Sequence, residues 1–213
     1  MSTLRVLADI HGQTDKYYNL VKDQEYSLQL GDFGFRENYN ILDKLDPEKH
    51  KVLFGNHCDY SLFGKRPHFL GDFGPLEFAG LEGAFYVRGE RSIDYRYRTL
   101  GLDLFWEEEL TFRQQYEAFE AYCLAKPNFM FSHGCPSSII PLIVGNNKFD
   151  GQWLTPSRTS ELLEEMFRAN KPHLWIFGHY HKFFRERING CDFVCLPELG
   201  YIDLDVDALN EGF

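Results

Sequence analysis

The chain has 213 residues, of which 44% are hydrophobic and 25% charged, a composition typical of a folded protein with a sizeable core. A formal net charge of −10 disfavours a protein that coats nucleic acid or anionic membranes, so we expect no stable nucleic-acid complex. No apolar run approaches the roughly 18 residues that span a bilayer, no signal sequence is recognisable, and the cysteines are irregularly spaced. We therefore expect a cytoplasmic protein without membrane association.

The amino-terminal quarter alternates between short apolar runs and segments of helical spacing. We predict strands at 3–8, 26–30 and 51–54 and helices at 13–22 and 38–45. The second helix ends at Asp46-Pro47, because a residue before proline avoids the α region. This β-α-β-α-β order predicts parallel strands whose carboxyl ends lie along one edge of a sheet.

The rest of the chain predicts a second, more antiparallel sheet and two further helices. We expect irregular excursions over 58–81 and 136–155, and helices at 111–126, opened by a capping box of Thr111 and Gln114, and at 157–170. The expected strands lie at 85–87, 97–104, 129–131, 174–177, 193–196 and 201–204, the last two completing the second sheet. Because no linker or repeat interrupts the pattern, we expect one domain over residues 1–213.

Five short polar motifs follow predicted strands: Asp9-Ile10-His11, Gly31-Asp32, Gly55-Asn56-His57, Ser132-His133-Gly134 and Gly178-His179-Tyr180-His181. In the first, the alternation of an extended chain is expected to point both ligands to one side and to leave Ile10 to the core. A single such residue is usually structural, but five of the eight histidines fall in these motifs. The carboxylates, amide and imidazoles together fit two divalent metal ions and one spare histidine for acid–base chemistry.

These motifs resemble the pattern of the calcineurin-like metallophosphoesterases, D-x-H, G-D, G-N-H-D/E, H and G-H-x-H. The resemblance implies an α/β fold, a four-layer α-β-β-α sandwich of two packed mixed sheets flanked by helices. It implies one metal on Asp9, His11, Asp32 and His181 and a second on Asp32, Asn56, His133 and His179. We expect manganese at both positions, with iron, zinc or nickel as alternatives.

The resemblance also implies a mechanism and substrate contacts. A hydroxide held between the metals would attack phosphorus while His57 protonates the leaving oxygen, although His57 could instead only hydrogen-bond Asn56. Arg36 has the spacing of a phosphate-binding arginine in related protein phosphatases, with a surface arginine as the alternative. Arg98, in a block that is similar to small bacterial and phage-type members, could clamp a phosphate or pair with Asp94.

Cys58 and Phe35 depart from the family pattern. Cys58 stands where the family has an acid that helps to orient the motif, which we expect a thiol to do poorly; Asp59 could substitute for it. Phe35 replaces the acid that supports the catalytic histidine in the related protein Ser/Thr phosphatases. This second departure argues against a protein Ser/Thr phosphatase.

The leading hypothesis is a binuclear metal-dependent phosphoesterase that hydrolyses phosphate mono- or diesters. Small-molecule or nucleotide diesters, such as 2′,3′-cyclic phosphates, are favoured. The alternatives are a protein phosphatase or nuclease variant and, below these, a non-catalytic scaffold of the same fold. Scaffold relatives usually lose ligands, whereas every ligand of the pattern and His57 are present here. The pattern predicts no particular oligomeric state.

Overall fold

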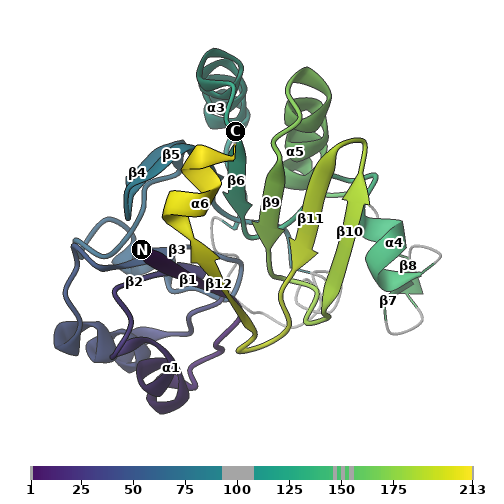
Figure 1. Ribbon diagram of the computed structural model, residues 1–213. Helices are drawn as coiled ribbons and strands as arrows, with labels where there is room; N and C mark the ends of the chain where they lie inside the picture. Colours follow the sequence, from purple (N-terminus) through teal and green to yellow (C-terminus); the bar gives the residue numbers. More distant parts are fainter. Residues whose placement is uncertain (1, 93–107, 146–147, 150–151, 154–155, 213) are drawn as a thin grey trace.

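The computed structural model describes residues 2–92, 108–145, 148–149, 152–153 and 156–212, and Figure 1 shows its helices and strands. Two β-sheets, one of four strands and one of six, make up the centre of the molecule. A short hairpin of β7 (Lys148–Phe149) and β8 (Gln152–Trp153) lies apart from them. In the described part of the chain, every helix is too short or too polar to cross a membrane.

The four-stranded sheet consists, in spatial order, of β12 (Tyr201–Asp205), β1 (Thr3–Leu7), β2 (Tyr26–Leu30) and β3 (His50–Leu53). As predicted, β1, β2 and β3 are parallel, so their carboxyl ends share one edge. The prediction that residues 201–204 complete the second sheet is wrong, because β12 pairs antiparallel with β1. In that register Leu204 lies opposite Leu4 and Asp203 opposite Arg5, which matches apolar and oppositely charged partners.

The six-stranded sheet consists of β10 (Phe184–Ile188), β11 (Cys191–Cys195), β9 (Leu174–Phe177), β6 (Phe129–Ser132), β5 (Leu81–Val87) and β4 (Phe73–Phe78). Its four central strands are parallel and the two edge strands pair antiparallel, so this sheet is mixed, with two antiparallel pairings against one in the four-stranded sheet. Both edge strands escape the sequence patterns. The three central residues of β10 are charged and β4 contains Pro75, which are features of sheet edges.

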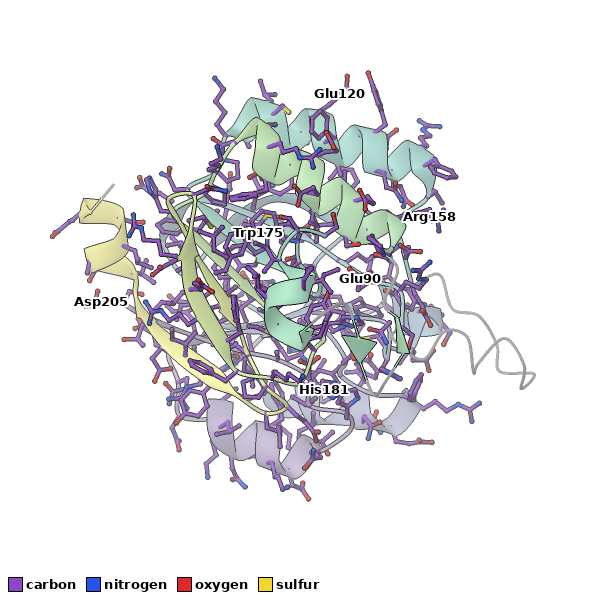
Figure 2. The ribbon with its side chains drawn as sticks, turned by 90° about the vertical axis from the view of Figure 1, so that its right-hand side faces the viewer. Glu90, Glu120, Arg158, Trp175, His181 and Asp205 are labelled. Carbon is purple, nitrogen blue, oxygen red and sulfur yellow. The ribbon has the colours of Figure 1, made fainter. Side chains whose placement is uncertain are left out.

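Helices cover the outer faces of both sheets. The helix α1 (Thr14–Val21) and the 3₁₀ helix η1 (Arg36–Lys44) pack on the four-stranded sheet, and α3 (Phe112–Ala125) and α5 (Arg158–Ala169) pack on the six-stranded sheet. A third apolar cluster, which includes Val6, Leu28, Phe131 and Ile176, fills the space between the sheets. Figure 2 shows α3 and α5 on one side of the sheets and α1 on the other. The four-layer sandwich is therefore confirmed.

Local signals explain most of the helix boundaries. The predicted capping box is present, because the Thr111 hydroxyl accepts the Gln114 backbone N–H at 3.3 Å and the Gln114 side chain accepts the Thr111 N–H at 2.9 Å. The predicted helix at 38–45 is a 3₁₀ helix that begins earlier, at Arg36. The expected irregular excursions contain η2 (Tyr60–Leu62) and α4 (Ile140–Val144), and α6 (Val206–Glu211) follows β12. The expected strand at 97–104 lies outside the described residues.

Candidate metal centre

The five motifs meet where strands of both sheets end. Asp9, Asp32 and Asn56 follow β1, β2 and β3, while His133 and His179 follow β6 and β9. Their side chains form two groups that share Asp32. We call Asp9, His11, Asp32 and His181 the open subsite, because His11 and His181 reach solvent, and Asp32, Asn56, His133 and His179 the closed subsite, because all four are buried.

In the closed subsite, His133 lies at the centre. Its Nε2 is 3.1 Å from Asp32 Oδ1, 2.9 Å from Asn56 Oδ1 and 3.3 Å from His179 Nδ1. Its Nδ1 lies 2.7 Å from the Leu30 carbonyl oxygen and donates a hydrogen bond to it. Since that bond holds a ring proton on Nδ1, Nε2 is the nitrogen that can give its lone pair to a metal.

In the open subsite, two imidazoles face each other. His11 Nε2 and His181 Nε2 are 2.9 Å apart, and His11 Nε2 is 3.7 Å from Asp32 Oδ2. The two oxygens of Asp32 therefore face different subsites. Asp9 Oδ2 accepts the His179 backbone N–H at 2.9 Å, whereas the buried Asp9 Oδ1 has no hydrogen-bond partner among the described residues.

The donor set fits divalent cations. Ligand atoms of the aspartates and histidines within each group lie within 4.8 Å of one another, and Asn56 Oδ1 lies 2.9 Å from both His133 Nε2 and His179 Nδ1. All of these atoms are nitrogen or oxygen donors. The buried Asp9 Oδ1, which has no hydrogen-bond partner among the described residues, is costly, and a bound cation would relieve that cost. The residues present thus fit the two metal positions that the sequence predicts.

Electrostatics at the centre couple the two carboxylates to His133. Burial would raise the pKa of Asp32, but His133, with smaller contributions from His57 and His11, holds it below its ordinary value. Burial raises the pKa of Asp9 well above its ordinary value, against the opposing effect of His133. Burial lowers the pKa of His179, and the neighbouring His133 lowers it further. The pKa values of these three residues are therefore shifted from their ordinary values, as expected where a cation binds.

Left-handed backbone turns orient five of the predicted ligands. The φ angles are +50° at Asp9, +44° at His11, +55° at Asp32, +71° at His179 and +51° at His181. The expectation that an extended chain aligns the pairs by alternation is therefore wrong, although Ile10 does enter the core as predicted. Such conformations are unfavourable for residues with a Cβ, and they gather at functional sites.

The glycines of three motifs make room for ligands that other motifs supply. A Cβ built on Gly55 would lie 2.7 Å from His133 Cε1, and one on Gly178 would lie 3.1 Å from Asp9 Cγ. A Cβ on Gly31 would overlap the His133 ring. These glycines therefore let the motifs approach one another closely enough to share metals.

His57 lies at the rim of the open subsite, and hydrogen bonds to Cys58 hold the loop that carries it. The His57 backbone N–H donates to Asp32 Oδ1 at 2.7 Å, and its ring centroid is 5.2 Å from that of His11. Cys58 Sγ accepts the backbone N–H groups of Phe33 at 3.4 Å and Gly55 at 3.2 Å. The expectation that Cys58 contributes little to orienting the motif is therefore wrong.

Asp59 does not replace the missing acid. Its carboxylate accepts the Ser61 backbone N–H at 3.1 Å, as the N-cap of η2, and the Arg36 backbone N–H at 3.4 Å. Arg36 itself is exposed, and among the described residues no contact between its side chain and a predicted ligand is recorded. Arg98 lies outside the described residues, so its predicted phosphate contact stays a prediction.

Two acids near the centre were missed by the sequence patterns. Glu198 accepts a hydrogen bond from the Gln13 side chain and acts electrostatically on Asp9 and on His181. It lies in the loop before β12, where no motif marks it. Glu90 lies beside the His133 turn, immediately after the Arg88-Gly89 pair whose spacing is similar to that of small family members.

Comparisons with solved structures show the same fold. A dimetal phosphatase from Danio rerio is 14% identical, with a TM-score of 0.57 over 94% of this chain and 91% of its own. A putative 5′-nucleotidase from Staphylococcus aureus, in complex with alpha-ketoglutarate, is 12% identical with a TM-score of 0.51. That match covers 95% of this chain but 50% of the nucleotidase, so the chain spans about half its length.

Sequence comparison places the chain more firmly than these distant structural likenesses. No curated protein sequence matches it at a significant level. A profile of the calcineurin-like phosphoesterases matches residues 3–183, which include all five motifs. The chain therefore belongs to the calcineurin-like phosphoesterase family.

Proposed function

We propose that the protein is a binuclear phosphoesterase that hydrolyses small phosphate diesters, such as nucleotide or 2′,3′-cyclic phosphates. The observation that carries the proposal is the pair of ligand groups that share Asp32, with one carboxylate oxygen facing each. The name of the Danio rerio relative, a dimetal phosphatase, supports a centre with two metals. We propose manganese as the metal and, because five free cysteines suit a reducing compartment, a cytoplasmic location.

The residues of the centre have distinct tasks in this proposal. Asp9, His11 and His181 would hold one ion and Asn56, His133 and His179 the other, with Asp32 between them. Bound divalent ions would supply an activated water and positive charge for the phosphoryl oxygens. The bond from His133 to the Leu30 carbonyl keeps its ring oriented before any ligand arrives.

His57 is the proposed general acid. Its backbone is anchored to Asp32, and its side chain is only partly buried, so its imidazole can reach a bound ester from the rim. Proton donation to the leaving oxygen by a positioned side chain contributes typically 100- to 10,000-fold in rate. The anchored backbone also supports the second reading of His57, a role in holding the Asn56 loop, and the two roles are compatible.

The surroundings of His57 favour a diester over a phosphoprotein. Phe35, at the position of the supporting acid of protein phosphatases, is 40% exposed, and its backbone N–H donates to Asn38 Oδ1 at 2.8 Å. Asp59 is occupied with Ser61 and the Arg36 amide. Neither residue supplies the acid on which protein phosphatases rely, which supports a small substrate.

A substrate panel tests the proposal. Metal-free protein is reloaded with manganese and assayed on bis(p-nitrophenyl) phosphate, p-nitrophenyl phosphate, 2′,3′-cyclic AMP and a phosphoserine peptide. We expect metal-dependent hydrolysis with the diesters preferred, and no loss in the control variant Asp192→Asn, whose carboxylate bonds Arg185 on the far edge strand. Preference for the phosphopeptide would contradict the diester assignment, and inactivity with manganese, iron, zinc and nickel alike would contradict the proposed function.

A further inference from the structure

Glu90 is a buried acid that the proposed mechanism does not use. Its side chain is 2% exposed, and its Oε1 accepts the Arg91 backbone N–H at 2.8 Å. Its Oε2 has no hydrogen-bond partner among the described residues. Burial raises the pKa of Glu90 to about 7, with Glu109 adding to the rise and Ser157 opposing it. A buried oxygen without a partner costs stability, so its presence calls for a function.

Oε2 lies directly against the turn that carries His133. A Cβ built on Gly134 would lie 2.9 Å from Glu90 Cδ and 3.0 Å from Glu90 Cγ, and would overlap Oε2. Gly134 is not among the residues with positive φ, so the need for glycine there is one of space. Figure 2 labels Glu90, which lies in the segment after β5.

The glycines of the other motifs make contacts that can be compared with the contact between Gly134 and Glu90. Gly31, Gly55 and Gly178 each leave room for a predicted metal ligand. Gly134 is the corresponding glycine of the fourth motif, and the group that fills its space is the carboxyl of Glu90. Glu90 thus packs against Gly134 as predicted metal ligands pack against the glycines of the other motifs.

The other sides of the His133 turn are already held. The Ser132 hydroxyl donates to the Gly134 carbonyl at 2.6 Å and accepts the Trp175 indole N–H at 2.8 Å. The Gly178 N–H donates to the His133 carbonyl at 3.0 Å. The contact of Gly134 with Glu90 adds to these bonds.

We propose that Glu90 is a positioning residue for the closed subsite. Its carboxyl holds the His133–Gly134 turn so that His133 Nε2 faces Asp32 and Asn56, and the ionised form of this carboxyl favours a divalent cation there. The inference rests on the proposed metal centre. It concerns the affinity of one metal position and requires no contact between Glu90 and the substrate.

Calorimetric titration of metal-free protein with manganese tests whether the charge of Glu90 strengthens binding at the closed subsite. We expect two binding steps in the unmodified protein and, in Glu90→Gln, a closed-subsite step weakened about tenfold with the open-subsite step unchanged, since outer partners of ligands are typically worth 10- to 100-fold in affinity. The matched control is Glu164→Gln, because Glu164 is a buried acid of α5 bound to Arg168 and the Ser138 N–H. Equal weakening of both steps, or none, would overturn the proposal.

A double-mutant cycle tests the packing. Gly134→Ala should weaken the closed-subsite step, because the added methyl displaces the Glu90 carboxyl. In Glu90→Ala the same methyl has room, so the double variant should bind manganese no more weakly than Glu90→Ala alone. If the losses of manganese affinity in the two single variants were strictly additive in the double variant, the proposed contact between Glu90 and Gly134 would be wrong. If the unmodified protein bound no manganese, the metal centre and this inference would both fail, whereas two normal steps without an effect of Glu90→Gln would overturn this inference alone.

Discussion

The open and closed subsites have similar ligands but differ in exposure. In the closed subsite His133 is fully buried and Asn56 and His179 nearly so, whereas in the open subsite His11 is 24% exposed and His181 is exposed. One position is thus built into the core where the sheets meet, and the other faces solvent. The difference implies that substrate approaches from the open subsite and that the closed subsite exchanges its ion more slowly.

The largest expected effect comes from removing the ligand that both subsites share. Asp32→Asn should lower diester hydrolysis by about 1,000-fold or more, because metal stabilisation of the transition state is worth several kcal/mol and each 1.4 kcal/mol is tenfold. Initial rates and metal content measured together check this. Retention of two tightly bound ions by the variant would contradict the shared role, and Asp192→Asn serves as the control.

The next effect separates chemistry from metal binding. His57→Gln should lower the rate by about 100-fold or more, with both manganese steps unchanged, because His57 lies at the rim and not among the grouped donors. The loss should shrink for esters with a good leaving group such as p-nitrophenolate, which needs little protonation. An equal loss for all leaving groups would instead assign His57 to holding the Asn56 loop.

A paired substitution tests the difference between the subsites. His181→Ala and His133→Ala should each reduce metal content to about one ion per chain. Only His133→Ala should also lower the melting temperature of the metal-free protein, because it removes a buried ring bonded to the Leu30 carbonyl. If both variants melted alike, the account of a closed subsite integrated into the core would be wrong.

The last expected effect is on stability and not on rate or metal content. The folded-state pKa of Glu90 is raised from 4.5 to about 7 by burial and, to a smaller extent, by Glu109, with Ser157 as the largest opposing group, so folding retains its proton. Stability from this group is therefore full below about pH 4.5 and falls as pH rises through about 7. Over this pH range the free energy of unfolding of metal-free Glu90→Gln should rise relative to that of the unmodified protein, by at most about 3 kcal/mol. Urea unfolding at several pH values measures the difference, and a pH-independent difference would contradict it.

The sequence motifs predict the residues of the centre better than they predict its geometry. Strand-end placement of Asp9, Asp32 and Asn56 follows from β-α-β order, and the structure brings them together as expected. The left-handed backbones of Asp9 and Asp32 could not be predicted, because tertiary contacts impose conformations that local preference disfavours.

Edge strands and outer acids were harder to predict for a related reason. The charged strand β10 carries no apolar alternation, and the pairing of β12 with β1 depends on partners nearly two hundred residues apart in the sequence. Glu90 carries no sequence signal of burial, since glutamate is ordinarily exposed. Its role depends on the glycine it faces, which only the packed structure reveals.

Anomalous diffraction from crystals of manganese-loaded protein tests the central claim most directly. The account predicts two manganese peaks, one surrounded by Asp9, His11 and His181 and the other by Asn56, His133 and His179, with Asp32 contacting both. A single peak, or peaks that Asp32 does not join, would contradict the binuclear centre on which the proposed hydrolysis depends.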